Sequence, residues 1–185
     1  MNTSTGQCSL FLHPGQFNFT LKDLSPFIAS LQKIGLLAQR INSSDDNNYF
    51  IGDRFLEYIA YMGCSPAIQF EASENKSEFC HVKIHHYESA KLIFSQQHSR
   101  APLCPNCNKA VTNWHANKTE SQIFCKQCNT TSHIDAFNWR KMAGYAQIFI
   151  EITDVFPKEA IPQQLLLNKL NEFFDVKWQY FYACQ

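Results

Sequence analysis

The stretch Cys104-Pro105-Asn106-Cys107, together with Cys125-Lys126-Gln127-Cys128, decides how the middle of this 185-residue chain is organised. Each pair of cysteines encloses two residues, and seventeen residues, 108–124, separate the pairs. A tight Cys-x2-Cys turn directs both sulfurs toward one point, and four thiolates surround one metal ion tetrahedrally. An Asn follows each pair, and Asn tolerates the left-handed backbone conformation that such a turn needs. The spacing therefore predicts a metal site whose ligands are Cys104, Cys107, Cys125 and Cys128.

Cys-Pro-Asn-Cys-Asn and Cys-Lys-Gln-Cys-Asn resemble the two knuckles of a zinc ribbon. The resemblance covers residues 100–141 and implies one structural Zn²⁺ held by the four cysteines. Four thiolates also hold iron, so the spacing leaves the choice between zinc and iron open. Two disulfides, or four unrelated buried thiols, are the alternatives to a metal site.

The redox environment of the protein affects the choice between a metal site and disulfides. The first residues, Met-Asn-Thr-Ser-Thr-Gly, carry no positive charge followed by an apolar run, so we expect no secretory signal and a cytoplasmic location. Thiols stay reduced in the cytoplasm, which favours metal binding over disulfides. The remaining cysteines show no ligand spacing, and we expect them to be buried free thiols: Cys8, Cys64, Cys80 and Cys184.

Composition limits the class of protein. Of all residues, 45% are hydrophobic and 17% are charged, which is enough apolar content for a soluble domain with a core of its own. No apolar run approaches the roughly 20 residues that a membrane-spanning helix needs. The formal net charge is zero, which argues against strong nonspecific binding to polyanions.

The charge of residues 101–141 points the same way. Glu120 and Asp135 oppose five cationic residues, which are Lys109, Lys118, Lys126, Arg140 and Lys141, so the side-chain charge is 5 − 2 = +3. Four thiolates on one Zn²⁺ contribute −2, which leaves a metal-loaded segment of about +1. That charge favours nucleic acid only weakly.

Apolar periodicity predicts an α+β fold, a mostly antiparallel sheet with helices packed on one side. Residues 1–99 and 142–185 form the predicted body, and residues 100–141 form a zinc-ribbon insert. We expect helices to follow a capping box at Thr20 and Asp23, and to span 53–62 and 163–174. Gly35 is expected to end the first helix. Predicted strands cover 9–12, 67–70, 80–84, 91–94, 145–152 and 176–182, with a ribbon hairpin of 110–114 and 122–125.

Other reactive residues give weaker signals. On a strand, His81 and His85 share a face about 13 Å apart while His86 points away, so one strand cannot bring them to one ion. His115 and His133 lie near the ribbon cysteines, but four thiolates already complete a tetrahedron. Cys64 follows a helix end, where a thiolate is disfavoured. The chain contains no phosphate-binding loop, nucleophile elbow or His-Glu-x-x-His helix, and we predict no catalytic residue.

A binding role follows as the main hypothesis, with another protein as the partner and the metal as a rigid support. The first alternative is weak binding of single-stranded nucleic acid, because the segment that holds the cysteines carries the five Lys and Arg residues named above and also aromatic residues on which bases can stack. Those aromatic residues are Trp114, Phe124, Phe137 and Trp139. An enzyme with no familiar motif is the second alternative.

Overall fold

The computed structural model describes residues 8–41, 47–62, 70, 79–97, 100–155 and 159–184. Its main element is a six-stranded sheet in which every pair of neighbouring strands is antiparallel, in the order β10-β1-β8-β5-β3-β2. The strands are β1 (Cys8–Pro14), β2 (Leu37–Arg40), β3 (Asn48–Ile51), β5 (Val82–Phe94), β8 (Ala143–Ile152) and β10 (Trp178–Cys184). The predicted α+β class is confirmed.

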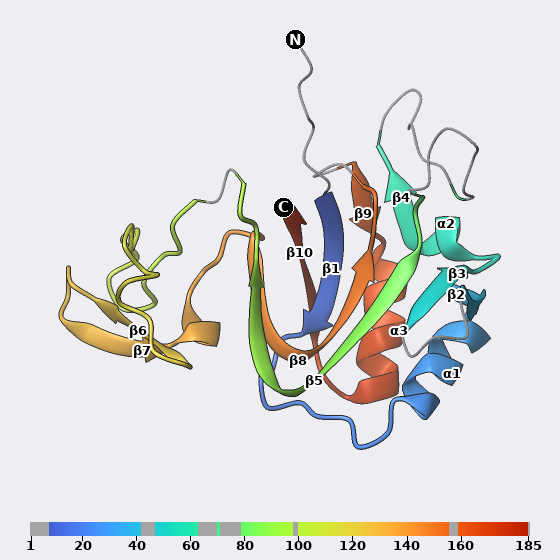
Figure 1. Ribbon diagram of the computed structural model, residues 1–185, viewed down its shortest axis with the longest axis horizontal. Coiled ribbons are helices and arrows are strands. Elements are labelled where there is room, and N and C mark those ends of the chain that lie inside the picture. Colours follow the sequence, from blue (N-terminus) through green and yellow to red (C-terminus); the bar gives the residue numbers. More distant parts are fainter. Residues whose placement is uncertain are drawn as a thin grey trace, which may run out of the picture.

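Three helices lie together beside this sheet. In Figure 1 they are on the side away from the hairpin of β6 (Gln122–Cys125) and β7 (Thr130–His133). They are α1 (Ser25–Lys33), α2 (Phe55–Tyr58) and α3 (Gln164–Phe174). Phe27 and Leu31 of α1 and Leu166 and Leu170 of α3 are buried against Leu10, Leu12, Val82, Ile148, Ile150 and Ile152 of the sheet. The apolar stripes that the sequence shows on both long helices thus form the main core. None of the described helices is long and apolar enough to cross a bilayer.

The opposite face of the sheet buries a second group of apolar side chains, and none of the described helices lies over it. Phe149 is fully buried and Phe181 is 1% exposed, and Phe11 stacks on Phe181 with ring centroids 5.1 Å apart. The sheet is curved here, since β10 contacts β8 although β1 lies between them. This curvature of the sheet buries the side chains on its inner face. Gly144 permits the close approach, since a Cβ there would stand 2.5 Å from the Phe181 ring.

The connections to the cysteine segment leave from the ends of β5 and β8, and that segment lies to one side of the sheet (Figure 1). It contains β6 (Gln122–Cys125), β7 (Thr130–His133) and a short 3-10 helix, Ile134–Ala136. The predicted hairpin of 110–114 with 122–125 is wrong, because β6 pairs with β7 instead. The second knuckle lies at the turn between those strands, so the pairing of β6 with β7 also positions two of the four cysteines. The predicted boundary between body and insert stays a prediction.

The predicted helix over 53–62 is also wrong. Helix α2 ends at Tyr58, and β4 (Ile59–Tyr61) then pairs with β9 (Ala160–Pro162). Phe55 and Ile59 are buried, but Leu56 is 60% exposed and Met62 is 62% exposed. Pairing with a distant strand overrides the helical spacing here, as it often does for short apolar runs.

Two other local expectations need correction. The predicted strands 80–84 and 91–94 are parts of the single strand β5, whose register with β8 shifts between His86 and Lys91. The capping box is absent: α1 begins at Ser25, whose amide donates to Asp23 Oδ1 at 2.8 Å. Strands β2 and β3 were not predicted, and residues 67–69 lie outside the described residues. Gly35 follows α1 with a φ of 76°, as expected for a helix end.

Candidate metal centre

The four predicted ligands come together at one point. Their sulfur atoms all lie within 4.8 Å of one another. Cys104 Sγ is 3.7 Å from Cys128 Sγ, and Cys107 Sγ is 3.8 Å from Cys125 Sγ. Each of these short distances joins one knuckle to the other, so both knuckles contribute to a single site.

Backbone geometry in each knuckle places the sulfurs. Asn108 and Asn129 both adopt the left-handed conformation, each with a φ of 55°. In the first knuckle the Asn108 amide donates to the Cys104 carbonyl at 2.9 Å, which closes the turn. Gln127 Nε2 of the second knuckle donates to the Ala110 carbonyl at 3.0 Å. The expectation that Asn suits these two positions is confirmed.

The sulfur separations fit one tetrahedral ion. With a metal–sulfur bond of about 2.3 Å, a regular four-thiolate tetrahedron has sulfur–sulfur edges of about 3.8 Å. The two measured separations, 3.7 and 3.8 Å, agree with that value. A disulfide requires about 2.05 Å, so these cysteines are not disulfide-bonded. Four clustered cysteines can therefore bind a metal ion here.

Burial and charge at the site suit a closed, structural centre. Cys104 and Cys125 are each 1% exposed, while Cys107 and Cys128 are half-buried. The Thr130 hydroxyl lies 2.9 Å from Cys128 Sγ, and the side-chain hydrogen bonds of Cys128 to Thr130 and to Asn106 are the largest causes that lower the pKa of the thiol to about 6. Thr130 has no ligand spacing, but it follows Cys128 by only two residues, so the contact is local. Four protein ligands leave no open coordination position for a substrate.

A small apolar core supports the cysteines. Besides Cys104 and Cys125, its buried members are Ala143 and six larger side chains, which are Val111, Trp114, Ile123, Ile134, Phe137 and Trp139. Trp114 and Trp139 meet edge to face with ring centroids 4.9 Å apart, and Trp139 Nε1 donates to the Ile134 carbonyl at 3.0 Å. Phe94, at the end of β5, packs edge-on against Trp114 at 5.2 Å. The core of the ribbon is therefore in contact with the end of the large sheet.

Neither nearby histidine belongs to the cysteine cluster. His115 is exposed and stacks on Trp114 with ring centroids 3.5 Å apart. His133 Nδ1 is hydrogen-bonded to the Asp135 carboxylate, and its ring lies 4.3 Å from that of Phe17. Among the described residues, the four cysteines form the only group of three or more His, Cys, Asp or Glu with ligating atoms close enough for one ion.

The histidines of β5 belong to a polar network instead. His85 Nε2 lies 2.6 Å from Glu151 Oε2, and Ser9 Oγ donates to Glu151 Oε1 at 2.6 Å. Burial raises the pKa of Glu151, but these hydrogen bonds outweigh that effect and the pKa is lowered overall. Ser9, His85 and Glu151 line a cavity of about 260 Å³. His81 also borders this cavity, and burial lowers the pKa of His81. Sequence reasoning missed Glu151, because only the pairing of β5 with β8 places it opposite Lys83 and beside His85.

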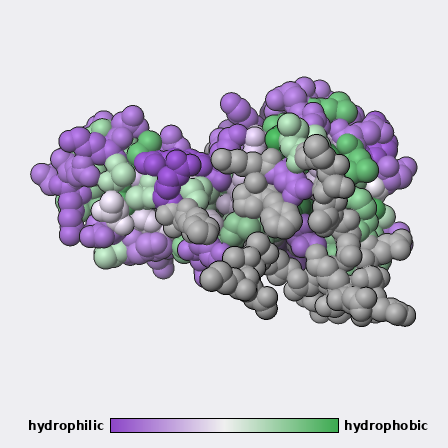
Figure 2. All heavy atoms as spheres, turned by 90° about the horizontal axis from the view of Figure 1, so that it is seen from above, coloured by the Kyte–Doolittle hydropathy of each residue, from purple (hydrophilic) through white to green (hydrophobic). Residues whose placement is uncertain are grey.

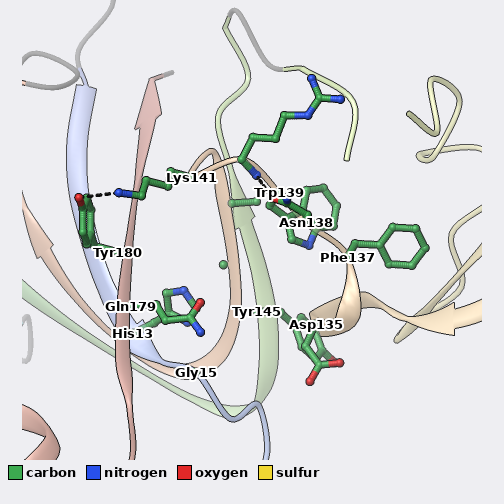
Figure 3. Close-up of a pocket in the computed structure, with 13 residues that line it drawn as sticks. His13, Gly15, Asp135, Phe137, Asn138, Trp139, Lys141, Tyr145, Gln179 and Tyr180 are labelled. Atoms are coloured by element: carbon green, nitrogen blue, oxygen red, sulfur yellow. Dashed lines mark hydrogen bonds between the residues drawn. The ribbon is translucent and has the colours of Figure 1, made fainter. Parts of the chain in front are cut away.

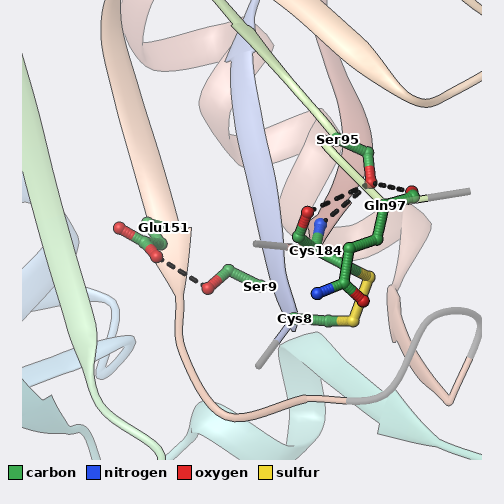
Figure 4. The surroundings of a disulfide bond; sticks show 6 residues. All are labelled: Cys8, Ser9, Ser95, Gln97, Glu151 and Cys184. Atoms are coloured by element: carbon green, nitrogen blue, oxygen red, sulfur yellow. Dashed lines mark hydrogen bonds between the residues drawn. A yellow bond between two sulfur atoms is a disulfide. The ribbon is translucent and has the colours of Figure 1, made fainter. Parts of the chain in front are cut away.

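The remaining cysteines divide into two kinds. Cys8 and Cys184 form a disulfide between paired residues at the ends of β1 and β10 (Figure 4), so the expectation of free thiols is wrong for both. Their separation of 176 residues leaves no local signal for the pairing. Cys80 is a buried free thiol, as expected, and burial raises its pKa to about 11. Cys64 lies outside the described residues.

Comparisons of the chain with protein-family models, with curated proteins and with solved structures found no match. The site must therefore be interpreted from its own geometry.

Proposed function

We propose that the protein binds one Zn²⁺ through Cys104, Cys107, Cys125 and Cys128, and that the metal has a structural role. The observation that carries this proposal is the sulfur separation of 3.7–3.8 Å between the knuckles, which matches a single four-thiolate ion. A multi-iron cluster occupies more space than one ion and needs its four thiolates farther apart. Zinc is preferred over a single iron because closed four-cysteine sites of this spacing are typical of structural zinc.

Substitution with cobalt tests the ligand set. Co²⁺ added to the metal-free protein is expected to give the strong visible absorption of a tetrahedral thiolate site, at one equivalent per chain. One equivalent of Zn²⁺ should then abolish that absorption, because Zn²⁺ binds such sites more tightly than Co²⁺. Weak absorption typical of octahedral cobalt would contradict the four-thiolate assignment.

We further propose that the protein is a binding module whose partner is another protein. The nucleic-acid alternative relied on four aromatic residues together with five Lys and Arg residues. Three of the aromatic residues are buried in the ribbon core: Trp114 is 5% exposed, Phe137 4% and Trp139 8%. Only Phe124, at 37%, presents a ring to solvent. Hydrophilic residues cover most of the ribbon face visible in Figure 2. Bases stack on exposed rings, so this surface offers them little.

An oligonucleotide titration tests the class of partner. Zinc-loaded protein should bind single-stranded and duplex DNA or RNA only weakly, with a shallow dependence on salt, because a nearly neutral protein neutralises few phosphates. Fluorescence anisotropy at two salt concentrations measures both quantities. Sub-micromolar binding with a steep salt dependence would contradict the proposal and favour the nucleic-acid alternative.

A further inference from the structure

Three cationic side chains gather where the ribbon joins the sheet. Arg100 lies in the connection that leads into the ribbon, and Arg140 and Lys141 lie in the connection that leads back to β8. All three border one cavity of about 480 Å³. Its apolar wall includes Met142, Ile161, Tyr180 and Tyr182. Segments far apart in the sequence thus build one pocket with a cationic side and an apolar side.

The pocket lies along the outer edge of the sheet. β10 is the outermost strand, and the Tyr182 amide donates to the Lys141 carbonyl at 3.1 Å. On the other side, the Ser95 amide donates to the Met142 carbonyl at 2.9 Å. These bonds hold the returning connection between β10 and the end of β5, so the cationic residues have defined positions.

The backbone of the returning connection is unusual. Arg140 and Lys141 are consecutive non-glycine residues in the left-handed conformation, with φ of 54° and 59°. This conformation is unfavourable for residues with a side chain and needs support from its surroundings. Asn138 provides part of it, because its Oδ1 accepts the Arg140 amide at 2.9 Å. The fold therefore holds two cationic residues in an unfavourable turn at the cavity.

Among the described residues, the charges in this pocket have no negative counterpart. Lys141 Nζ donates to Tyr180 Oη at 2.6 Å and lies 4.1 Å from the centre of the Tyr180 ring, contacts that leave its charge uncompensated (Figure 3). Arg140 Nε is buried, and no hydrogen-bond acceptor for it exists among the described residues. No Asp or Glu occurs among the described residues that line the 480 Å³ cavity. A buried N–H group without an acceptor is costly, and an anion would supply one.

A carboxylate in the neighbouring cavity is already engaged. Asp135 lines a smaller neighbouring cavity of about 230 Å³, which shares Arg140 and Lys141 with the larger one. Its carboxylate is hydrogen-bonded to His133 Nδ1. The cationic group is therefore open to an external anion.

We propose that the 480 Å³ cavity binds a small organic anion. Its carboxylate or phosphate would lie against Arg100 and Arg140, since guanidinium groups bind both kinds of oxyanion through paired hydrogen bonds. Its apolar part would lie against Met142, Ile161 and Tyr182. The volume falls within the range of about 300–1,000 Å³ that is typical of small-molecule sites. The three cations line one cavity, which suits a single anionic group. This inference does not rest on the zinc proposal or on a protein partner.

Calorimetric titration with three simple probes tests the site. Benzoate and phenyl phosphate carry the two kinds of anionic group on an apolar ring, and benzyl alcohol carries the ring without charge. At least one of the anions is expected to bind to the full-length protein, and benzyl alcohol is not. Tighter binding of benzoate assigns a carboxylate ligand, and tighter binding of phenyl phosphate assigns a phosphate ligand. Failure of both anions to bind at millimolar concentration would overturn the proposal.

Substitutions locate the binding. Arg140→Gln is expected to weaken the preferred anion about tenfold or more, because a hydrogen-bonded ion contact is lost. Lys118→Gln removes one positive charge from an exposed position that does not line the cavity, and should change affinity less than twofold. If Arg140→Gln fails to fold, Arg100→Gln takes its place with the same expected loss. A shift of the Arg140 Nε–H resonance in nuclear magnetic resonance spectra of the unmodified protein gives a second readout. Equal losses in the cavity variant and Lys118→Gln would overturn the site.

Discussion

Replacing Cys125 with Ser is expected to abolish metal binding and unfold the ribbon locally, while the six-stranded sheet stays folded. A core of six large side chains is too small to hold residues 100–141 together, and metal binding in such modules supplies most of the folding free energy. The main core instead draws on α1, α3 and all six strands of the sheet, and its buried members include none of residues 100–141. Hydrogen exchange followed by mass spectrometry, with Zn²⁺ present, measures protection in both regions.

The informative comparison is between β6–β7 and the second half of β8. Amides of residues 122–133 should exchange in Cys125→Ser as fast as in an unfolded chain. Residues 148–152 should keep their protection, although the start of β8 will lose some, because Ala143 belongs to the ribbon core. Cys80→Ala provides the control, since it removes a buried thiol outside the metal site. Equal loss of protection in 148–152 and 122–133 would refute a separately stabilised ribbon.

The second large effect is expected at Phe149. This side chain is fully buried on the face of the sheet that none of the described helices covers, in edge-on contact with Phe181 at 6.2 Å. Phe149→Ala should lower the free energy of unfolding by about 3–5 kcal/mol, because it removes a large apolar side chain and leaves a cavity. Urea unfolding followed by circular dichroism measures the loss.

Phe173→Ala is the matched control for this change. Phe173 lies on α3 and is 42% exposed, so its truncation should cost less than about 1 kcal/mol. Both variants should retain the wild-type metal content, because neither residue contacts the cysteine cluster. A loss below about 1 kcal/mol in Phe149→Ala would mean that the curved face is not a tightly packed second core.

The sequence predicted those elements in which local pattern and tertiary environment agree. Leu166 and Leu170 are spaced for one helix face, and that face meets the sheet. Strand 145–152 is apolar on both faces, and β8 lies in the interior of the sheet with apolar groups on both sides. The metal ligands were the clearest case, because the Cys-x2-Cys turn and the following Asn determine the geometry locally.

Prediction failed where distant pairing decides the structure. Ile59 fits a helical stripe and a strand equally well, and only its pairing with Pro162 selects the strand. Residues 87–90 interrupt the apolar alternation, so the sequence does not show that β5 is one continuous strand. Its continuity depends on a register shift against β8. No local pattern indicates the Cys8–Cys184 pair or the placement of Arg100 and Arg140 at one cavity, because the fold alone determines both.

Metal content measured by elemental analysis of the purified protein tests the central claim most directly. We predict one Zn²⁺ per chain and little iron. In a double variant with Cys104→Ser and Cys128→Ser, we predict a zinc content near zero. These two sulfurs lie 3.7 Å apart across the two knuckles, so their loss removes one ligand from each half of the site. Absence of zinc from the unmodified protein, or one equivalent of iron in its place, would contradict the assignment.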